Sequence, residues 1–188
     1  MIEREIKLLF DSQPGARAAI ISAGAAPLKC RRLQEDALFD TDDESLRRRG
    51  CALRIRNDSG RSLLTFKGPV QPGAVKTREE HETVISDGDV LTHVFESLGL
   101  HVWFRYQKFR EEFAAEDATI ALDETPIGTF IEIEGGERAI LKMTGALGRT
   151  PDDFILDSYR GLFLARREQF GLKGANMMFA DEWSQRSS

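Results

Sequence analysis

The sequence predicts an α+β protein in which eight antiparallel strands close into a β-barrel and helices pack on its outside. Three observations lead to this prediction. Eight segments alternate apolar and polar residues with a period of two. Turn-forming residues separate several of these segments, which predicts hairpins and antiparallel pairing. Charged residues gather on one face of strand after strand, and a closed barrel offers such faces a shared interior.

The strands are expected at residues 2–10, 32–40, 52–57, 62–67, 77–86, 102–113, 119–123 and 128–135. Glycine, proline, asparagine and aspartate mark the turns between several of them. Helices are expected at 14–25, 90–98, 137–143 and 151–170. The last of these follows Thr150, a capping hydroxyl, and begins with Pro151 and two acids, which is typical of a helix start.

Length and composition favour one domain in a reducing compartment. The chain has 188 residues and 41% hydrophobic content, enough for a core without disulfides or metal staples. Cys30 and Cys51 stand in no metal-binding or disulfide pattern, which favours a cytoplasmic location. Neither a leader peptide nor an apolar run of about 18 residues is seen, so we expect no membrane segment.

The balance of acidic and basic residues indicates which kinds of partner the chain can bind. Lys and Arg number 26 against 31 Asp and Glu, giving a net charge of −5, which argues against general nucleic-acid binding. An anionic ligand must therefore be held by local positive charge. The polar residues from Lys173 to Ser188 are expected to fray.

The first strand shows the charge pattern most plainly. Glu3, Glu5 and Lys7 share one face, while Ile6 and Leu8 lie on the other. One such strand is ordinary in a sheet with a wet face. The pattern recurs, however, and the inward set contains seven acids and seven bases: Glu3, Glu5, Glu80, Glu82, Asp123, Glu132, Glu134, Lys7, Arg54, Arg56, Lys67, Arg78, Lys108 and Arg110.

These charges predict a ligand and a metal. Burying so many ions costs several kcal/mol each, roughly, unless partners or a ligand compensate. Acids spaced at i and i+2 on a strand place carboxylates side by side, which suits Mg²⁺ or Mn²⁺ better than zinc. A divalent ion together with a row of bases favours a polyphosphate ligand. A non-catalytic binding module and a purely structural ion-paired barrel are the alternatives.

Several motifs resemble the CYTH domain, or triphosphate tunnel metalloenzyme, superfamily. Glu3-Arg4-Glu5-Ile6-Lys7 is similar to its N-terminal hallmark. Further matches follow in order: Phe39-Asp40-Thr41, Leu53-Arg54-Ile55-Arg56, Thr65-Phe66-Lys67, Arg78-Glu79-Glu80-His81-Glu82, Lys108-Phe109-Arg110, and Asp123 with Gly128, Glu132 and Glu134. The resemblance covers residues 1–170 and leaves 171–188 as a C-terminal tail.

The resemblance implies roles for individual residues. Metal ligands would be Glu3, Glu5, Glu80, Asp123, Glu132 and Glu134. Substrate phosphates would be bound by Arg54, Arg56, Lys67, Arg78, Lys108 and Arg110, and the catalytic residues would be Lys7, Arg54 and Lys108. The implied fold is the triphosphate tunnel barrel, and its implied cofactor is Mg²⁺ or Mn²⁺.

The resemblance also implies an activity. The sequence is most similar to class IV adenylate cyclase-like proteins, which implies conversion of ATP to cyclic AMP and pyrophosphate. Inorganic or organic triphosphate hydrolysis is the alternative within the family. The expected partner is a small-molecule triphosphate, and a homodimer is compatible with the sequence.

Two groups of residues are interpreted as structural. Arg47, Arg48 and Arg49 are expected to form a solvated helix face. The aromatic residues Trp103, Phe104, Tyr106 and Phe109 are expected to belong to the core.

Overall fold

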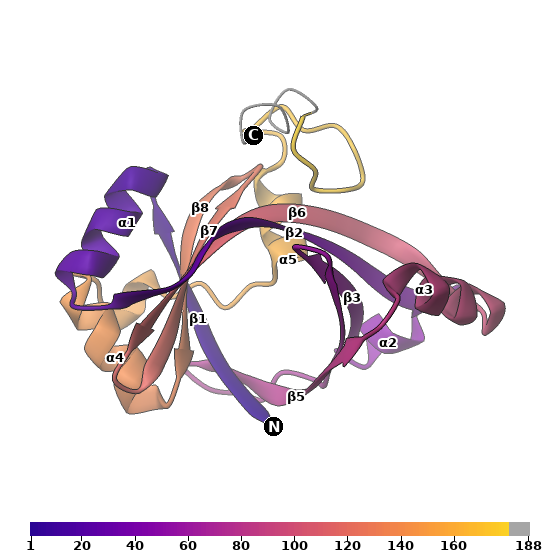
Figure 1. The fold of residues 1–188 in the computed structure, drawn as a ribbon, viewed down its shortest axis with the longest axis horizontal. Coiled ribbons are helices and arrows are strands. Elements are labelled where there is room, and N and C mark those ends of the chain that lie inside the picture. The colour runs from indigo at the N-terminus through magenta and orange to yellow at the C-terminus, as the bar shows by residue number, and fades with distance from the viewer. Residues whose placement is uncertain (181–188) are drawn as a thin grey trace.

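The computed structural model describes residues 1–180 and shows a closed barrel of eight antiparallel strands (Figure 1). The strands neighbour one another in the order β1-β5-β4-β3-β2-β6-β7-β8. Their bounds are β1 Ile2–Phe10, β2 Ala26–Thr41, β3 Ala52–Asp58, β4 Arg61–Lys67, β5 Lys76–Ile85, β6 Leu100–Ala115, β7 Ala118–Thr125 and β8 Gly128–Gly135. The predicted fold class is confirmed.

β1 closes the barrel because it pairs with strands on both sides. Its first half pairs with β5, and its second half pairs with β8, where Lys7 lies opposite Glu132. The outward residues Ile6 and Leu8 are fully buried. They pack with Ile131 and Ile133 of β8 in a core between the barrel wall and two helices.

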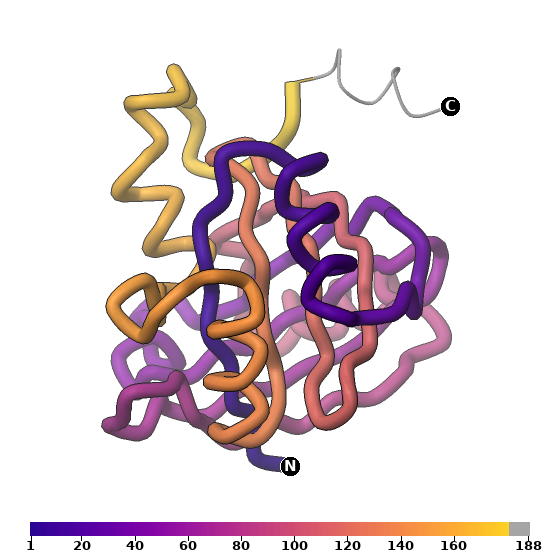
Figure 2. Tube along the Cα trace, turned by 90° about the vertical axis from the view of Figure 1, so that its left-hand side faces the viewer, coloured from indigo at the N-terminus to yellow at the C-terminus, as the bar shows by residue number. Residues whose placement is uncertain are grey.

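Those two helices are α1 (Gln13–Ser22) and α4 (Glu137–Ala146), which cover β1, β7 and β8 side by side (Figure 2). Ser12 caps α1 by accepting a hydrogen bond from the backbone N–H of Gly15. The helices α2 (Ser45–Arg48) and α3 (Gly88–Ser97) lie on the other side of the barrel (Figure 1).

The predicted continuous helix at 151–170 is wrong. A short 3₁₀ turn, Pro151–Asp153, is followed by an extended segment, and α5 begins only at Tyr159 and ends at Arg166. Ile155 exchanges two backbone hydrogen bonds with Lys7, at 3.0 and 2.9 Å, which holds the segment extended. Ser158 then provides a second cap by accepting from Gly161 N–H.

The segment after α5 packs against β6. Met177 is fully buried among α5 and β6 side chains, and its backbone bonds to Arg105 and Gln107. The expected fraying from residue 173 onward therefore does not describe residues 173–180. The remainder of the proposed tail, 181–188, lies outside the described residues.

None of the helices in residues 1–180 combines the length and apolar character needed to cross a membrane.

Candidate functional site: the charged barrel cavity

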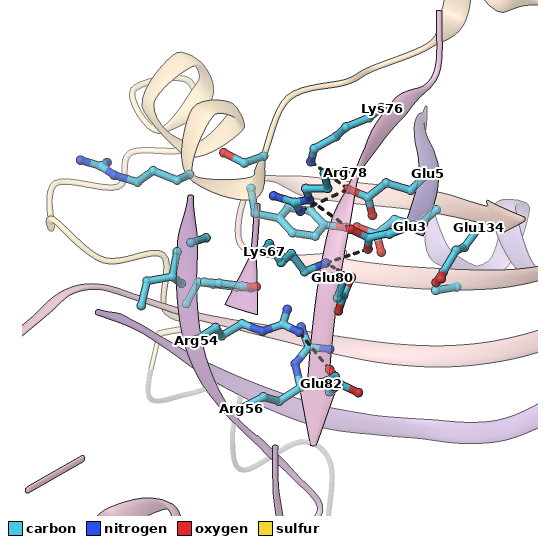
Figure 3. A pocket seen from close by; sticks show the side chains of 18 of the residues that line it. Glu3, Glu5, Arg54, Arg56, Lys67, Lys76, Arg78, Glu80, Glu82 and Glu134 are labelled. Atoms are coloured by element: carbon cyan, nitrogen blue, oxygen red, sulfur yellow. Dashed lines mark hydrogen bonds and ion pairs between the residues drawn. The ribbon is translucent and has the colours of Figure 1, made fainter. Parts of the chain in front are cut away.

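The barrel encloses a cavity of about 1000 Å³ whose wall carries both acids and bases (Figure 3). Period-two alternation places these side chains inward, because their strand neighbours form the outer apolar core. The cavity is at the upper end of the size range of small-molecule sites, roughly 300–1,000 Å³. It therefore has room for more than an inorganic triphosphate.

One group of carboxylates, the acid cluster, consists of Glu3, Glu80 and Glu134. Lys67 bridges two of them, with its Nζ 2.7 Å from Glu3 Oε1 and 2.9 Å from Glu80 Oε2 (Figure 3). Arg78 Nε donates to Glu3 Oε2 at 3.1 Å. Glu134 has no ion pair within residues 1–180, and the carboxylates of the cluster are short of positive charge.

The pKa values in the acid cluster reflect this shortage. Burial, followed by repulsion from Glu5, raises the pKa of Glu3. Partial burial, followed by repulsion from Glu3 and Glu80, raises the pKa of Glu134 to about 7, although this side chain is more exposed than the other two of the cluster. Burial acts to raise the pKa of Glu80, but the charge and hydrogen bond of Lys67, together with Glu3 and Arg54, outweigh it and the net shift is downward.

Deeper in the barrel, Lys7 joins Glu5 to Glu132, with 3.3 Å to each carboxylate. Lys76 also donates to Glu5 at 2.8 Å. Burial opposes the charged form of Lys7, but its two carboxylate neighbours outweigh burial and raise its pKa. Lys7 is therefore a fixed positive charge.

A second deep group surrounds Asp123, which is fully buried. Lys108 Nζ lies 2.8 Å from Asp123 Oδ2, and Arg110 Nε donates to Oδ1 at 2.7 Å. The hydroxyl of Tyr159 from α5 donates to the same carboxylate at 2.6 Å. Arg110 also pairs with Glu132. Burial and the charge of Arg110 lower the pKa of Lys108 to about 8.

Asp36 organises the wall formed by β2 and β3. Arg56 Nε donates to Asp36 Oδ1 at 2.8 Å, and Arg54 Nε is 3.4 Å from the same oxygen. Arg54 also reaches Thr65 at 3.0 Å and Glu82 at 3.5 Å. Burial opposes ionisation of Asp36, but the two arginines lower its pKa overall. This carboxylate fixes two guanidinium groups against the cavity.

Comparison with known proteins shows which family the chain with this charged barrel belongs to. The sequence model of the CYTH domain matches residues 1–142. The chain belongs to the CYTH domain family. A Methanocaldococcus jannaschii protein named “Putative adenylate cyclase” is 32% identical in an alignment of 176 positions that covers 86% of this chain and all of that protein.

Solved structures share the CYTH barrel. A Pyrococcus horikoshii protein is 28% identical with a TM-score of 0.72, and the match covers 88% of this chain and 99% of that one. A Vibrio parahaemolyticus protein, also named a putative adenylate cyclase, is 20% identical with a TM-score of 0.75 over 87% and 98% of the two chains. A Hippeastrum protein, reported to have a dominant triphosphatase activity, is 20% identical with a TM-score of 0.56 over 99% and 95%.

The CYTH barrel brings most of the predicted site residues to one cavity. The substrate-binding set, Arg54, Arg56, Lys67, Arg78, Lys108 and Arg110, lines it, as do Lys7 and the acids Glu3, Glu5, Glu80, Glu132 and Glu134. Five of the six predicted metal ligands divide into two groups: Glu3, Glu80 and Glu134 form the acid cluster, whereas Asp123 and Glu132 are held by Arg110. Glu5 lies between Lys7 and Lys76.

The acid cluster fits a hard divalent cation by its chemistry. Its donors are all carboxylate oxygens, one of them is unpaired, and Mg²⁺ or Mn²⁺ prefers such ligands. In residues 1–180, no three Asp, Glu, His or Cys side chains already surround one point. The ammonium of Lys67, between Glu3 and Glu80, supplies the positive charge that a cation would supply there.

Sequence reasoning missed several cavity residues. Gln34 and Asp36 share one face of β2 and are both buried, but Glu35 between them interrupts the apolar–polar alternation and weakens the period-two signal. Lys76 precedes the predicted strand start by one residue but lies on the same face as Arg78. Tyr159 comes from α5 and carries no signal in the strand pattern. Arg47 and Trp103, interpreted as a solvated helix face and as core, also line the cavity.

Proposed function

We propose that this CYTH domain is a divalent-metal-dependent enzyme acting on the triphosphate of ATP or a related triphosphate, by the class IV adenylate cyclase route. The observation that carries the proposal is the acid cluster, in which Lys67 and Arg78 pair with Glu3 and Glu80 while Glu134 stays unpaired among the described residues. A carboxylate without a cationic partner would repel an anion in a simple anion-binding site, and it would add no ion pair to a structural scaffold. The name of the Methanocaldococcus jannaschii relative supports the cyclase route.

In this proposal the bases hold the phosphates and the acid cluster holds the metal. Glu3, Glu80 and Glu134 would bind Mg²⁺ or Mn²⁺, which would neutralise developing charge on the phosphate oxygens. Arg54, Arg56, Lys67, Arg78 and Arg110 neutralise the remaining phosphate charge.

The cyclase reaction joins the ribose 3′-oxygen to the α-phosphorus, breaks the bond from that phosphorus to the bridging oxygen, and releases pyrophosphate. The 3′-hydroxyl proton needs an acceptor. In this proposal Lys108 is the acceptor, because a buried amine with a pKa of about 8 is partly neutral near physiological pH.

Triphosphate hydrolysis is the second candidate. It uses the same bases and acids, but water attacks the γ-phosphorus and phosphate leaves. The Hippeastrum protein, which shares the fold, is reported to have a dominant triphosphatase activity.

Product analysis tests the proposal. The protein is incubated with ATP and Mn²⁺, with and without EDTA, and the products are separated by chromatography. Equal amounts of cyclic AMP and pyrophosphate, lost with EDTA, are expected. Phosphate with ADP, or cleavage of inorganic triphosphate while ATP stays intact, would contradict the cyclase route and support hydrolysis. Binding without turnover would support the binding-module alternative.

A matched pair of variants tests the metal site. If the Glu134 carboxylate binds the cation, Glu134→Gln is expected to lower turnover by about tenfold or more. Glu168→Gln changes an exposed carboxylate outside the cavity and serves as the control. Equal activity of the two variants would place the metal elsewhere.

A further inference from the structure

A β-bulge turns Trp103 toward the barrel cavity. In the pairing of β2 with β6, Leu38 lies opposite Phe104 and the next residue, Phe39, lies opposite Val102, so Trp103 is the extra residue of the bulge. Bulges re-aim side chains and are frequent beside active sites. Here the bulge lets two successive residues, Trp103 and Phe104, both line the cavity.

A buried carboxylate fixes Arg47 over the indole of Trp103. Asp40 is fully buried and accepts hydrogen bonds from the backbone N–H groups of Leu46 at 2.9 Å and Arg47 at 3.1 Å. The Nε of Arg47 donates to the same carboxylate at 3.1 Å. The Arg47 guanidinium thereby lies 4.2 Å from the ring centroid of Trp103. A rigid, planar guanidinium on an aromatic ring is a stacking surface.

Arg160 adds a second guanidinium from the first turn of α5. It lies 5.0 Å from the ring of Phe104 and 5.7 Å from that of Trp103. Its Nη1 is buried without a hydrogen-bond partner, and within residues 1–180 no carboxylate lies at ion-pair distance from it. The positive charge of Arg160 is therefore uncompensated, and burial together with the like charges of Arg47 and Arg167 lowers its pKa.

An unpaired buried donor beside aromatic rings matches a particular class of ligand. Nucleic-acid bases stack on aromatic side chains and on guanidinium planes, and their ring nitrogens and carbonyls accept hydrogen bonds from arginine. An inorganic triphosphate has no group that stacks. The cavity is continuous from these residues to the acid cluster.

We infer that Arg47, Trp103 and Arg160, supported from behind by the buried ring of Phe104, form a stacking subsite for the planar base of a nucleoside triphosphate whose phosphates lie among the Lys and Arg side chains of the cavity. The inference rests on the proposed function, because it assumes that a triphosphate occupies the cavity. It makes the organic part of the substrate, rather than the phosphate chain alone, a determinant of selectivity. Trp103 and Arg160 are the specificity-determining residues.

Binding measurements on the full chain test the subsite. Calorimetry with Mn²⁺ compares α,β-methylene-ATP, which cannot release pyrophosphate, with inorganic triphosphate. Trp103→Leu and Arg160→Gln are each expected to weaken the nucleotide analogue about tenfold and to leave inorganic triphosphate within about twofold. Arg138→Gln removes an exposed guanidinium on α4 and is the control. Equal effects on both ligands, or none on either, would overturn the inference.

Fluorescence gives a readout that does not depend on the folding of a cavity variant. The chain has two tryptophans, and the second, Trp183, lies outside the described residues. In Trp183→Phe, emission comes from Trp103 alone. Quenching by the nucleotide analogue, and not by inorganic triphosphate, is expected; the same response to both ligands would contradict stacking.

The two proposals fail in different ways. Base-dependent binding without any turnover would reject the proposed enzyme and keep the subsite. Turnover of ATP without base-dependent binding would reject the subsite and keep the enzyme. If the unmodified protein bound neither ligand, both would be rejected.

Discussion

Carboxylates inside the barrel differ in how completely they are paired, and this decides what each one does. Asp36 and Asp123 are each surrounded by cationic or hydroxyl donors, so they hold arginines and lysines in position. Glu134 has no such partner within the described residues and shares its surroundings with Glu3 and Glu80. The paired acids therefore build the site, whereas the unpaired one is available to a ligand.

The unpaired carboxylate predicts a pH dependence. A folded-state pKa of about 7 for Glu134 lies above the ordinary value of 4.5, so its protonation stabilises the fold at low pH. That contribution is complete below about pH 4.5 and is lost as the pH rises through about 7. Glu134→Gln is expected to remove this part of the decline in the melting temperature of metal-free protein between those pH values.

Thermal unfolding from pH 4.5 to 8 without metal checks this prediction, with Glu168→Gln as the matched control. If the melting temperatures of Glu134→Gln and of the parent protein changed equally with pH, the other carboxylates of the acid cluster would not raise the pKa of Glu134.

Asp36 is a paired carboxylate, and its removal is expected to destabilise the fold. Asp36→Asn would leave Arg56 without its counter-ion and Arg54 with only the 3.5 Å ion pair to Glu82 among the described residues, which is expected to cost about 3–5 kcal/mol in the free energy of unfolding. Denaturant unfolding measures it. Asp117→Asn, at an exposed turn, should change stability by no more than about 0.5 kcal/mol. Similar midpoints for both variants would mean that Asp36 is dispensable to the barrel.

At the scale of elements, strands were predictable and the last helix was not. Strand faces follow from a local period of two, so Glu3, Arg54 and Glu132 could be assigned to the interior from sequence alone. The segment at 151–158 is set by pairing between Ile155 and Lys7, residues far apart in the chain. Local capping signals at Pro151 and Ser158 are both genuine, but nothing local says that a strand-like piece separates them.

The same limit explains Met177. It lies in a segment without a helix or strand pattern, after Lys173, Gly174 and Asn176, yet it is fully buried against α5 and β6. Met177→Ala is expected to cost about 2–5 kcal/mol in unfolding free energy, as for other large-to-small core substitutions. Met178→Ala, at a half-buried neighbour, should cost less. Equal losses in denaturant titrations would contradict the docking of this segment on the barrel.

At the scale of the whole molecule, the barrel holds many buried charges whose mutual pairing is incomplete. A ligand that completes the pairing binds the folded protein and not the unfolded chain, so it must stabilise the fold. Mn²⁺ with a triphosphate at about 100 times its dissociation constant is expected to add about 2.7 kcal/mol. For a chain of this size that raises the melting temperature by roughly 5–10 °C.

Differential scanning calorimetry measures this shift, and EDTA should abolish most of it. Arg54→Ala should reduce the shift more than it lowers the melting temperature of ligand-free protein. A ligand-free loss as large as the loss of the shift would favour the structural ion-pair alternative.

The two-sided pairing of β1 has a consequence for how the chain is made. β1 leaves the ribosome before the other seven strands, but its partners β5 and β8 are at Lys76–Ile85 and Gly128–Gly135. Hairpins such as β3–β4 and β7–β8 can form as soon as they emerge, since their contacts are local. The first strand must wait through most of translation, with Ile6 and Leu8 uncovered, before the last strand arrives. Barrel closure is therefore expected to be the late, slow step of folding, and during translation β1 is the strand most exposed to chaperones and to aggregation.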